Sequence, residues 1–282
     1  MITSKELQYV SMRANRIPMP GTEYSKKVLE EIKNCYELYN KKYKNKEYSI
    51  IFSNSEEIDF EILTKNLCHM MGIDYNNIKG EYFDDYRENV FGTSAADFTS
   101  YDLLEMIIEN MDKVAAYDNN ADNTVKAVNY YKSAIKCEIF NKLTDFDKFN
   151  FAAINYIGNR DDIEYDKQKL LFISSNEAVT PYFMMGIKQE EDTSKYVVAS
   201  LMAPDNPKYF FENQEVVIPT QILVNDNQNL EKKVATAEEK MRLLTMYSNI
   251  INKYNLPNRI NIYGDYENML NELCNQKVYK LK

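Results

Sequence analysis

The sequence has 282 residues, and its 44% hydrophobic and 27% charged residues are typical of a globular protein with a sizeable core. Its net charge of −9 disfavours non-specific binding to nucleic acid, because phosphate binding needs clustered Lys and Arg side chains, but it leaves room for a local basic site. No apolar run opens the sequence as a secretory signal would, and no run is long enough to span a membrane. We therefore expect a cytoplasmic protein with no membrane partner.

The first part of the chain predicts helices followed by a hairpin. Apolar residues at helical spacing predict helices at residues 3–14 and 25–39, the first opened by a capping box. Alternating apolar residues then predict two strands, at 48–53 and 57–63. A short helix should follow and end at Gly72, which suits the left-handed position after a helix.

The middle of the chain predicts mainly helices. Residues 74–100 are acidic and weakly periodic, as a loop would be. Residues 99–115 and 122–143 each carry an apolar face at helical spacing, and they predict a helical hairpin. Residues 149–157 are expected to add a short third helical piece.

The second half of the chain predicts an antiparallel sheet and a long helix. Short β-branched and aromatic runs, separated by turn residues, predict strands at 170–173, 182–187, 196–202 and 216–219. Apolar residues then recur every four and three positions, and they predict a helix at 228–254, roughly 40 Å long. A strand at 259–263 and a helix at 266–274 complete the prediction.

These elements predict an α+β fold, with N-terminal helices, a helical-hairpin insertion, an antiparallel sheet and a long C-terminal helix. We divide the chain into residues 1–73 (N-terminal helices and first hairpin), 74–165 (helical insertion), 166–225 (strands completing the sheet) and 226–282 (C-terminal helical segment). The few heptads of the long helix favour packing on the domain over a free coiled coil, although the same helix is the candidate contact for a homodimer.

Neither a metal nor a cofactor is expected. The four cysteines lie far apart, and the chain has a single histidine, whereas a zinc site needs about four such ligands at close spacing. The acidic clusters lack the spacing of a calcium loop. The seven glycines form no phosphate-binding or dinucleotide-binding motif.

His69, the only histidine, follows the predicted hairpin directly. Histidine titrates near working pH, so it is a natural general acid or base. Two interpretations remain open: a structural histidine between Cys68 and Met70 on a short amphipathic helix, or a catalytic group in metal-independent phosphodiester cleavage.

Such cleavage needs a base for the RNA 2′-hydroxyl, groups that stabilise the phosphorane and a proton donor for the leaving oxygen. The candidate catalytic residues are His69, Lys169, Arg160 and Tyr182. Thr180, Lys195 and Tyr196 also lie at strand starts or turns, and each is equally explained as plain surface or packing.

The hairpin and the following Asn66-Leu67-Cys68-His69-Met70-Met71-Gly72-Ile73 resemble the phage barnase–EndoU–colicin–RelE-like nuclease group, fourth subfamily. In that group a strand pair leads into an apolar, histidine-containing turn. The resemblance covers about residues 25–225, and it implies N-terminal helices on an antiparallel sheet and metal-free RNA cleavage in conflicts between mobile elements and hosts. Only His69 carries over, because the second histidine of several relatives has no counterpart here.

Two functions follow from these observations. The first is a phage-type endoribonuclease that acts on RNA, which the lone histidine favours. The second is a non-catalytic acidic protein that binds and inhibits a host defence nuclease, in the manner of an anti-CRISPR protein, with carboxylates that imitate phosphates. The acidic net charge favours the second. A structural oligomer built through residues 228–254 is a third, weaker alternative.

Overall fold

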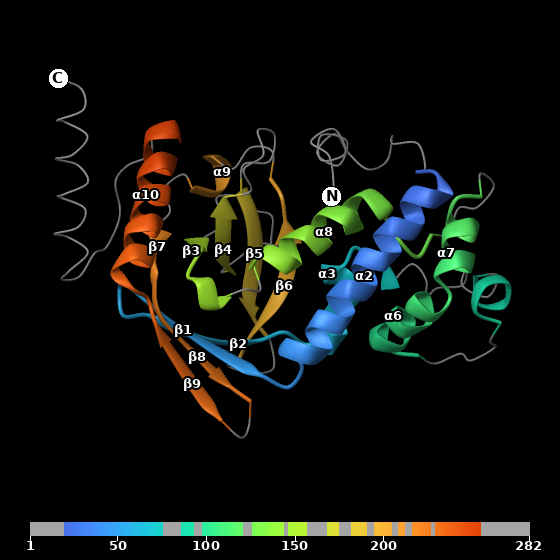
Figure 1. Cartoon of the computed structure of the whole chain (residues 1–282), viewed down its shortest axis with the longest axis horizontal. Coiled ribbons are helices and arrows are strands. Elements are labelled where there is room, and N and C mark those ends of the chain that lie inside the picture. Colours follow the sequence, from blue (N-terminus) through green and yellow to red (C-terminus); the bar gives the residue numbers. More distant parts are fainter. Residues whose placement is uncertain are drawn as a thin grey trace.

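The computed structural model describes residues 20–75, 86–92, 98–120, 126–143, 146–156, 168–174, 182–190, 195–204, 208–211, 216–226 and 229–254. They form an α+β fold in which helices pack on a curled, mostly antiparallel sheet, as the sequence predicts (Figure 1). The helices are α2 (Thr22–Lys42), α3 (Leu67–Met70), α6 (Ser100–Glu109), α7 (Met111–Asp118), α8 (Tyr130–Leu143), α9 (Lys208–Phe211) and α10 (Ala237–Tyr254), with short turns η2 (Thr64–Asn66), η3 (Arg87–Phe91) and η4 (Phe146–Lys148). The strands are β1 (Glu47–Phe52), β2 (Glu57–Glu61), β3 (Ala152–Tyr156), β4 (Gln168–Ser174), β5 (Tyr182–Gln189), β6 (Tyr196–Met202), β7 (Val216–Val217), β8 (Pro219–Asn225) and β9 (Leu230–Val234).

The described strands form one sheet in the order β7-β3-β4-β5-β6-β2-β1-β8-β9. Neighbours pair antiparallel except β2 and β6, which form a short parallel ladder between Phe60 and Tyr196 and between Glu61 and Val197. Only Ile218 separates β7, at one end of the order, from β8, near the other end. The sheet must therefore curl to bring these two regions together.

The predicted elements between residues 25 and 63 are present. The side chains of β1 and β2 alternate between buried and more exposed positions, which confirms the hairpin. Helix α2 begins at Thr22, three residues before the predicted cap Ser25, whose side chain is buried. The apolar face of α2 packs on α8. Residues 3–14 lie outside the described part of the chain.

Two apolar clusters hold the helices on opposite faces of the sheet. The larger one joins α2, α6 and α8 to one face of all the central strands, through side chains such as Ile32, Ile139 and Phe60. In the smaller one Tyr247 and Ile250 of α10 pack on the opposite face of β3, β4 and β5. In Figure 1, α10 and α8 accordingly lie on different sides of these strands.

Residues 149–157, expected to be helical, contain strand β3, so this prediction is wrong. Strand β3 lies between β4 and β7, and Ala152, Ala153 and Ile154 are all fully buried. A strand buried on both faces loses the apolar–polar alternation that identifies a strand in a sequence. Strand β8 was also missed, because the prediction ended the last strand at Pro219.

The predicted helix at 228–254 is wrong in its first part, because residues Leu230–Val234 form strand β9. A spacing of four residues keeps two side chains on one face of a strand as well as of a helix, so Leu230 and Val234 fit either pattern. Helix α10 begins after Thr236, whose backbone and hydroxyl contact the Glu239 carboxylate while its hydroxyl accepts from the Glu239 amide. This capping box fixes the start of the helix. Residues 259–263 and 266–274 lie outside the described part.

The helices of the predicted hairpin exist with different bounds, but they do not pack on each other as a hairpin, because α2 contacts both α7 and α8. Thr99 and Asp102 form a capping box at the start of α6, and a break at Asn110 separates α6 from α7. Helix α8 begins only at Tyr130. No described helix is both long and apolar enough to cross a membrane.

Gly72 follows α3 and packs against the start of α8, at a position that only glycine fits well. Its φ is +75°, and its carbonyl oxygen accepts hydrogen bonds from the Ser133 hydroxyl (3.3 Å) and the Asn129 amide (3.3 Å). A Cβ on Gly72 would lie 2.6 Å from the Ser133 Oγ. The predicted role of Gly72 at the end of the short helix is confirmed.

The buried Asp118 organises the connection between α7 and α8. Its carboxylate accepts hydrogen bonds from the amides of Ala127 and Val128 (3.3 Å each) and from the Tyr130 hydroxyl (3.0 Å). Burial nevertheless raises the pKa of Asp118 to about 7, because the carboxylate is removed from water, and the hydrogen bonds oppose this effect only in part.

We predict that Gly72→Ala destabilises the chain by about 2–4 kcal/mol, because the left-handed backbone and the contact with Ser133 both penalise a Cβ. Gly92→Ala is the matched control: its φ is also positive (+65°), but nothing lies within 4 Å of the added Cβ. It should cost only about 1 kcal/mol. Denaturant unfolding measures both, and equal losses would contradict the role of the α3–α8 contact.

We also predict that Asp118 makes stability depend on pH. Its pKa is raised in the fold from 3.8 to about 7. The stability that the protonated carboxyl contributes is therefore complete below pH 3.8 and is lost as the pH rises to about 7. Asp118→Asn should flatten this part of the curve of unfolding free energy against pH. The control Asp112→Asn removes the same charge from a carboxylate with 83% side-chain exposure. An unchanged slope in Asp118→Asn would contradict the assignment.

Candidate functional site

His69 lies on the surface at the end of α3, beside helix α8. The residue is exposed, yet the protein atoms packed around its ring displace enough water to lower its pKa to about 4, and the positive charges of Lys136 and Lys132 lower it further. The nearby Asp74 opposes the shift. The imidazole is therefore neutral at neutral pH and able to accept a proton.

Lys136 of α8 contacts the backbone of His69. It is 5% exposed, and its Nζ donates a hydrogen bond to the His69 carbonyl oxygen (2.5 Å). Burial lowers the pKa of Lys136 to about 7, and the charge of Lys132, one helical turn away, lowers it as well. Among the described residues no carboxylate forms an ion pair with Lys136 or Lys132. This small basic area stands out on an acidic chain.

Lys169, a predicted catalytic residue, is engaged elsewhere. Its side chain is 4% exposed, forms an ion pair with Glu56 (2.7 Å) and lies 4.5 Å from the centre of the Phe52 ring. Glu56 belongs to the turn between β1 and β2. Lys169 therefore links β4 to this turn, and the geometry assigns it a structural role.

Tyr182 lies on the opposite face of the sheet from Lys169. Tyr182 packs against the rings of Phe172 (6.1 Å between centroids) and Phe211 (5.4 Å) in the smaller cluster, whereas Ile187, which pairs with Lys169, belongs to the larger one. The two positions are also five residues apart along β5, or roughly 17 Å. No described contact joins either residue to His69. Arg160 and Thr180 lie outside the described part of the chain.

A pocket of about 430 Å³ opens on the outer face of β2, β1 and β8, the face that points away from the larger cluster. Four carboxylates line it: Glu47 of β1 and Glu57, Asp59 and Glu61 of β2. Alternation along β2 places these three residues outward while Ile58 and Phe60 point into the core. We call these four carboxylates the acidic face.

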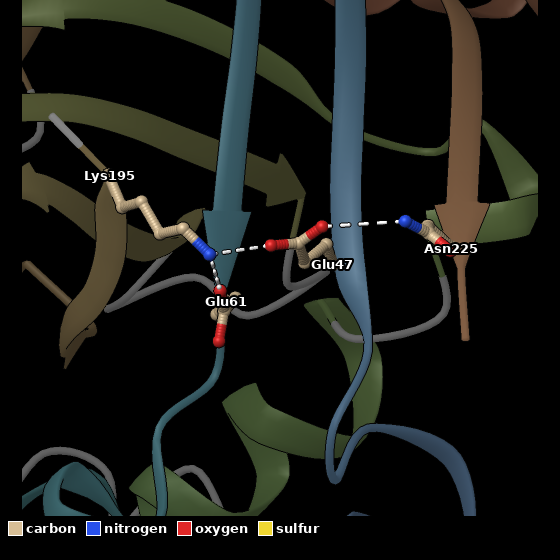
Figure 2. Close-up of polar contacts among 4 residues, drawn as sticks. All are labelled: Glu47, Glu61, Lys195 and Asn225. Carbon is tan, nitrogen blue, oxygen red and sulfur yellow. Dashed lines mark hydrogen bonds and ion pairs between the residues drawn. The ribbon is translucent and has the colours of Figure 1, made fainter. Parts of the chain in front are cut away.

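Lys195 holds two of these carboxylates together. Its Nζ donates to Glu47 Oε1 (2.6 Å) and to Glu61 Oε1 (2.7 Å), and Asn225 Nδ2 donates to Glu47 Oε2 (3.4 Å), as Figure 2 shows. Glu47 and Glu61 are direct neighbours in the β1–β2 register, where like charges repel. The Lys195 hydrogen bonds and charge lower the pKa of Glu47, and those of Glu47 and Glu61 raise the pKa of Lys195.

The acidic face keeps an excess of negative charge, because Lys195 is the one cation among the described residues that line the pocket with its four carboxylates. Among the described residues, no group of His, Cys, Asp and Glu side chains is placed to hold a metal ion. No described helix covers this face, and in Figure 1 β1, β8 and β9 form the lower margin of the molecule. The chemistry that such a surface suits is the binding of cationic groups.

Sequence reasoning recognised the outward positions of Asp59 and Glu61 but assigned them no role, because the pairing of Glu47 with Glu61 appears only in the strand register. It proposed Lys195 as one of several minor candidates for phosphate chemistry, and the structure places it among carboxylates.

A comparison of the chain with protein-family models, curated proteins and solved structures finds no match. The resemblance to the phage nuclease group stays a prediction.

Proposed function

We propose that the chain is a non-catalytic interaction protein of a mobile genetic element, which binds a basic protein surface through the acidic face. The observation that supports this proposal most directly is the row of outward carboxylates on β2, which lies on an uncovered sheet face beside the pocket. A partner with clustered Lys and Arg side chains complements such a row, and the resulting field also speeds association.

The spacing of the charges suggests which basic proteins fit. Glu57, Asp59 and Glu61 alternate along one strand, so their Cα atoms repeat about every 6.8 Å. A regular row of negative charges is also what a nucleic-acid strand presents to a protein. The partner class we propose is therefore a nucleic-acid-binding protein, and a host defence nuclease is the member of that class that a mobile element gains most from inhibiting.

The hydrogen bonds within the face support the same function. Lys195 and Asn225 fix the Glu47 carboxylate, and Lys195 fixes Glu61 as well. Side chains that are already ordered lose less conformational entropy when a partner binds. Lys195 also offsets the repulsion between the paired glutamates, so the face can carry a high charge density at a small cost in stability.

The experiment uses the intact chain as bait for proteins of the host, followed by binding and nuclease assays with each purified partner. We expect a basic nuclease that is released by salt or by competing RNA or DNA, and whose cleavage the chain inhibits. The triple variant Glu57→Gln/Asp59→Asn/Glu61→Gln should bind about tenfold more weakly or worse, because it removes the row of charges.

The control removes the same charge from exposed helix positions through Glu109→Gln/Asp112→Asn/Glu238→Gln. If both triple variants weaken binding equally, net charge and not the acidic face is responsible. Inhibition that survives neutralisation of the β2 row would overturn the proposal.

The His69 region supports a second candidate, a metal-independent endoribonuclease. The specific observation is a neutral, exposed imidazole beside two lysines, one of which has a pKa near 7. The imidazole could accept the proton of a 2′-hydroxyl while Lys132 stabilises the charge on the phosphate. Lys169 and Tyr182 take no part, because they lie elsewhere in the fold.

For this candidate, purified protein is incubated with RNA in the presence of a chelator. Cleavage should persist, rise as the pH increases through about 4, where His69 loses its proton, and then level off. His69→Ala should reduce the rate by about 100-fold or more. Cleavage that the chelator abolishes, or that His69→Ala leaves intact, would exclude the mechanism.

A further inference from the structure

Strand β9 ends the sheet order and leaves one edge open among the described residues. Two hydrogen bonds fix which backbone groups face its neighbour β8: the Ala235 amide donates to Thr220 O (2.9 Å), and the Asp226 amide donates to Asn229 O (3.3 Å). Alternate residues of a strand direct their N–H and C=O groups to the same side. Glu231 and Lys233 therefore face β8, whereas Leu230, Lys232 and Val234 face the open edge.

The same three residues carry side chains on the outer face of the sheet. Leu230 pairs with Asn225, and Val234 pairs with Gln221, so they share the face of the acidic pocket. Leu230 is 69% exposed and Val234 56% exposed, which is unusual for large apolar side chains in the described part of the chain. An open strand edge flanked by exposed apolar side chains is a ready template for another strand.

We propose that β9 pairs antiparallel with β9 of a second copy of this chain, around a two-fold axis at Lys232. In this register Leu230 lies opposite Val234 of the partner subunit, and Glu231 lies opposite Lys233 of the partner subunit, and the symmetry repeats both pairs. Two apolar contacts thus form on the outer face of the joined sheet, and two opposite-charge contacts form on its inner face. The sequence Leu-Glu-Lys-Lys-Val is self-complementary in this sense.

The direction of the backbone groups selects this register. Residues that face the open edge must meet residues that do the same, so a shift of the axis by half a residue leaves donors and acceptors unmatched. An axis at Glu231 would place Glu231 against Glu231 of the partner subunit, and an axis at Lys233 would place two Lys233 side chains together. Only the axis at Lys232 pairs all five residues of β9 and joins unlike charges.

The cost of the register is one pair of like charges, Lys232 against Lys232 of the partner subunit. This repulsion limits the affinity of the dimer and makes the affinity depend on the charge of residue 232. The sequence predicts a dimer contact within residues 228–254, and this proposal moves it from the helix to the strand that precedes it. Leu230 also lines the acidic pocket, so Val234 of the partner subunit would extend the pocket wall.

Sedimentation equilibrium of the full chain over a wide range of concentration tests the proposal, and we expect a reversible monomer–dimer equilibrium. Lys232→Pro removes an amide that points to the open edge and takes no part in the β8–β9 ladder, so it should abolish the dimer while circular dichroism stays unchanged. Lys232→Thr should tighten the dimer several-fold, because it removes the central repulsion. A wild-type chain that remains monomeric throughout overturns the proposal.

Charge exchange tests the register itself. Glu231→Lys and Lys233→Glu each convert two attractive pairs into repulsive ones and should weaken the dimer about tenfold, whereas the double variant Glu231→Lys/Lys233→Glu should restore it. Glu238→Lys on α10 makes the same change of charge away from β9, and it should have no effect. Failure of the double variant to restore the dimer overturns the register. The acidic face is unchanged in all these variants, so the result is separate from that of the partner-binding assay.

Discussion

The arrangement of the whole sheet depends on Ile218, the single residue between β7 and β8. Because β7 pairs with β3 and β8 pairs with β1, the ten residues around this point belong to two distant parts of the strand order. Ile218 is fully buried, its carbonyl accepts from the Ser53 amide (2.8 Å) and its amide donates to Ser53 Oγ (3.2 Å). These bonds tie the corner to the end of β1 and fix the curl of the sheet.

That curl divides the sheet into two parts with different exposure. The β3–β6 part receives helix α8 on one face and α10 on the other, whereas the β2-β1-β8-β9 part receives described helices on its inner face only. The two parts meet at the short parallel ladder of β2 and β6, and Lys195 stands at this junction with its bonds to Glu47 and Glu61. Through these bonds Lys195 both links the two parts of the sheet and orders two carboxylates of the acidic face.

The parts of the fold and of the site that can be predicted are those that leave a periodic pattern in the sequence. Alternation predicts β1 and β2, and the demand for a left-handed residue predicts the role of Gly72. Burial on both faces hides β3, and the ambiguity of a four-residue spacing hides β9. The role of a charged side chain is harder to predict. The sequence makes Lys169 a catalytic candidate, and only the fold shows its ion pair with Glu56. The acidic face depends on strand register, which a single sequence does not contain.

A dimer through β9 would also change how the acidic face binds. A two-fold axis perpendicular to the sheet keeps both outer faces on the same side, so both copies of the face would point in one direction. Seven strand intervals of about 4.8 Å separate β2 from β2 of the partner subunit, or roughly 34 Å before twist. A partner with two basic sites at a matching separation would engage both, and the second contact would then form at a high effective concentration. Weak self-association at the strand edge would in this way tighten the binding of a two-fold symmetric partner, without a larger surface on either copy.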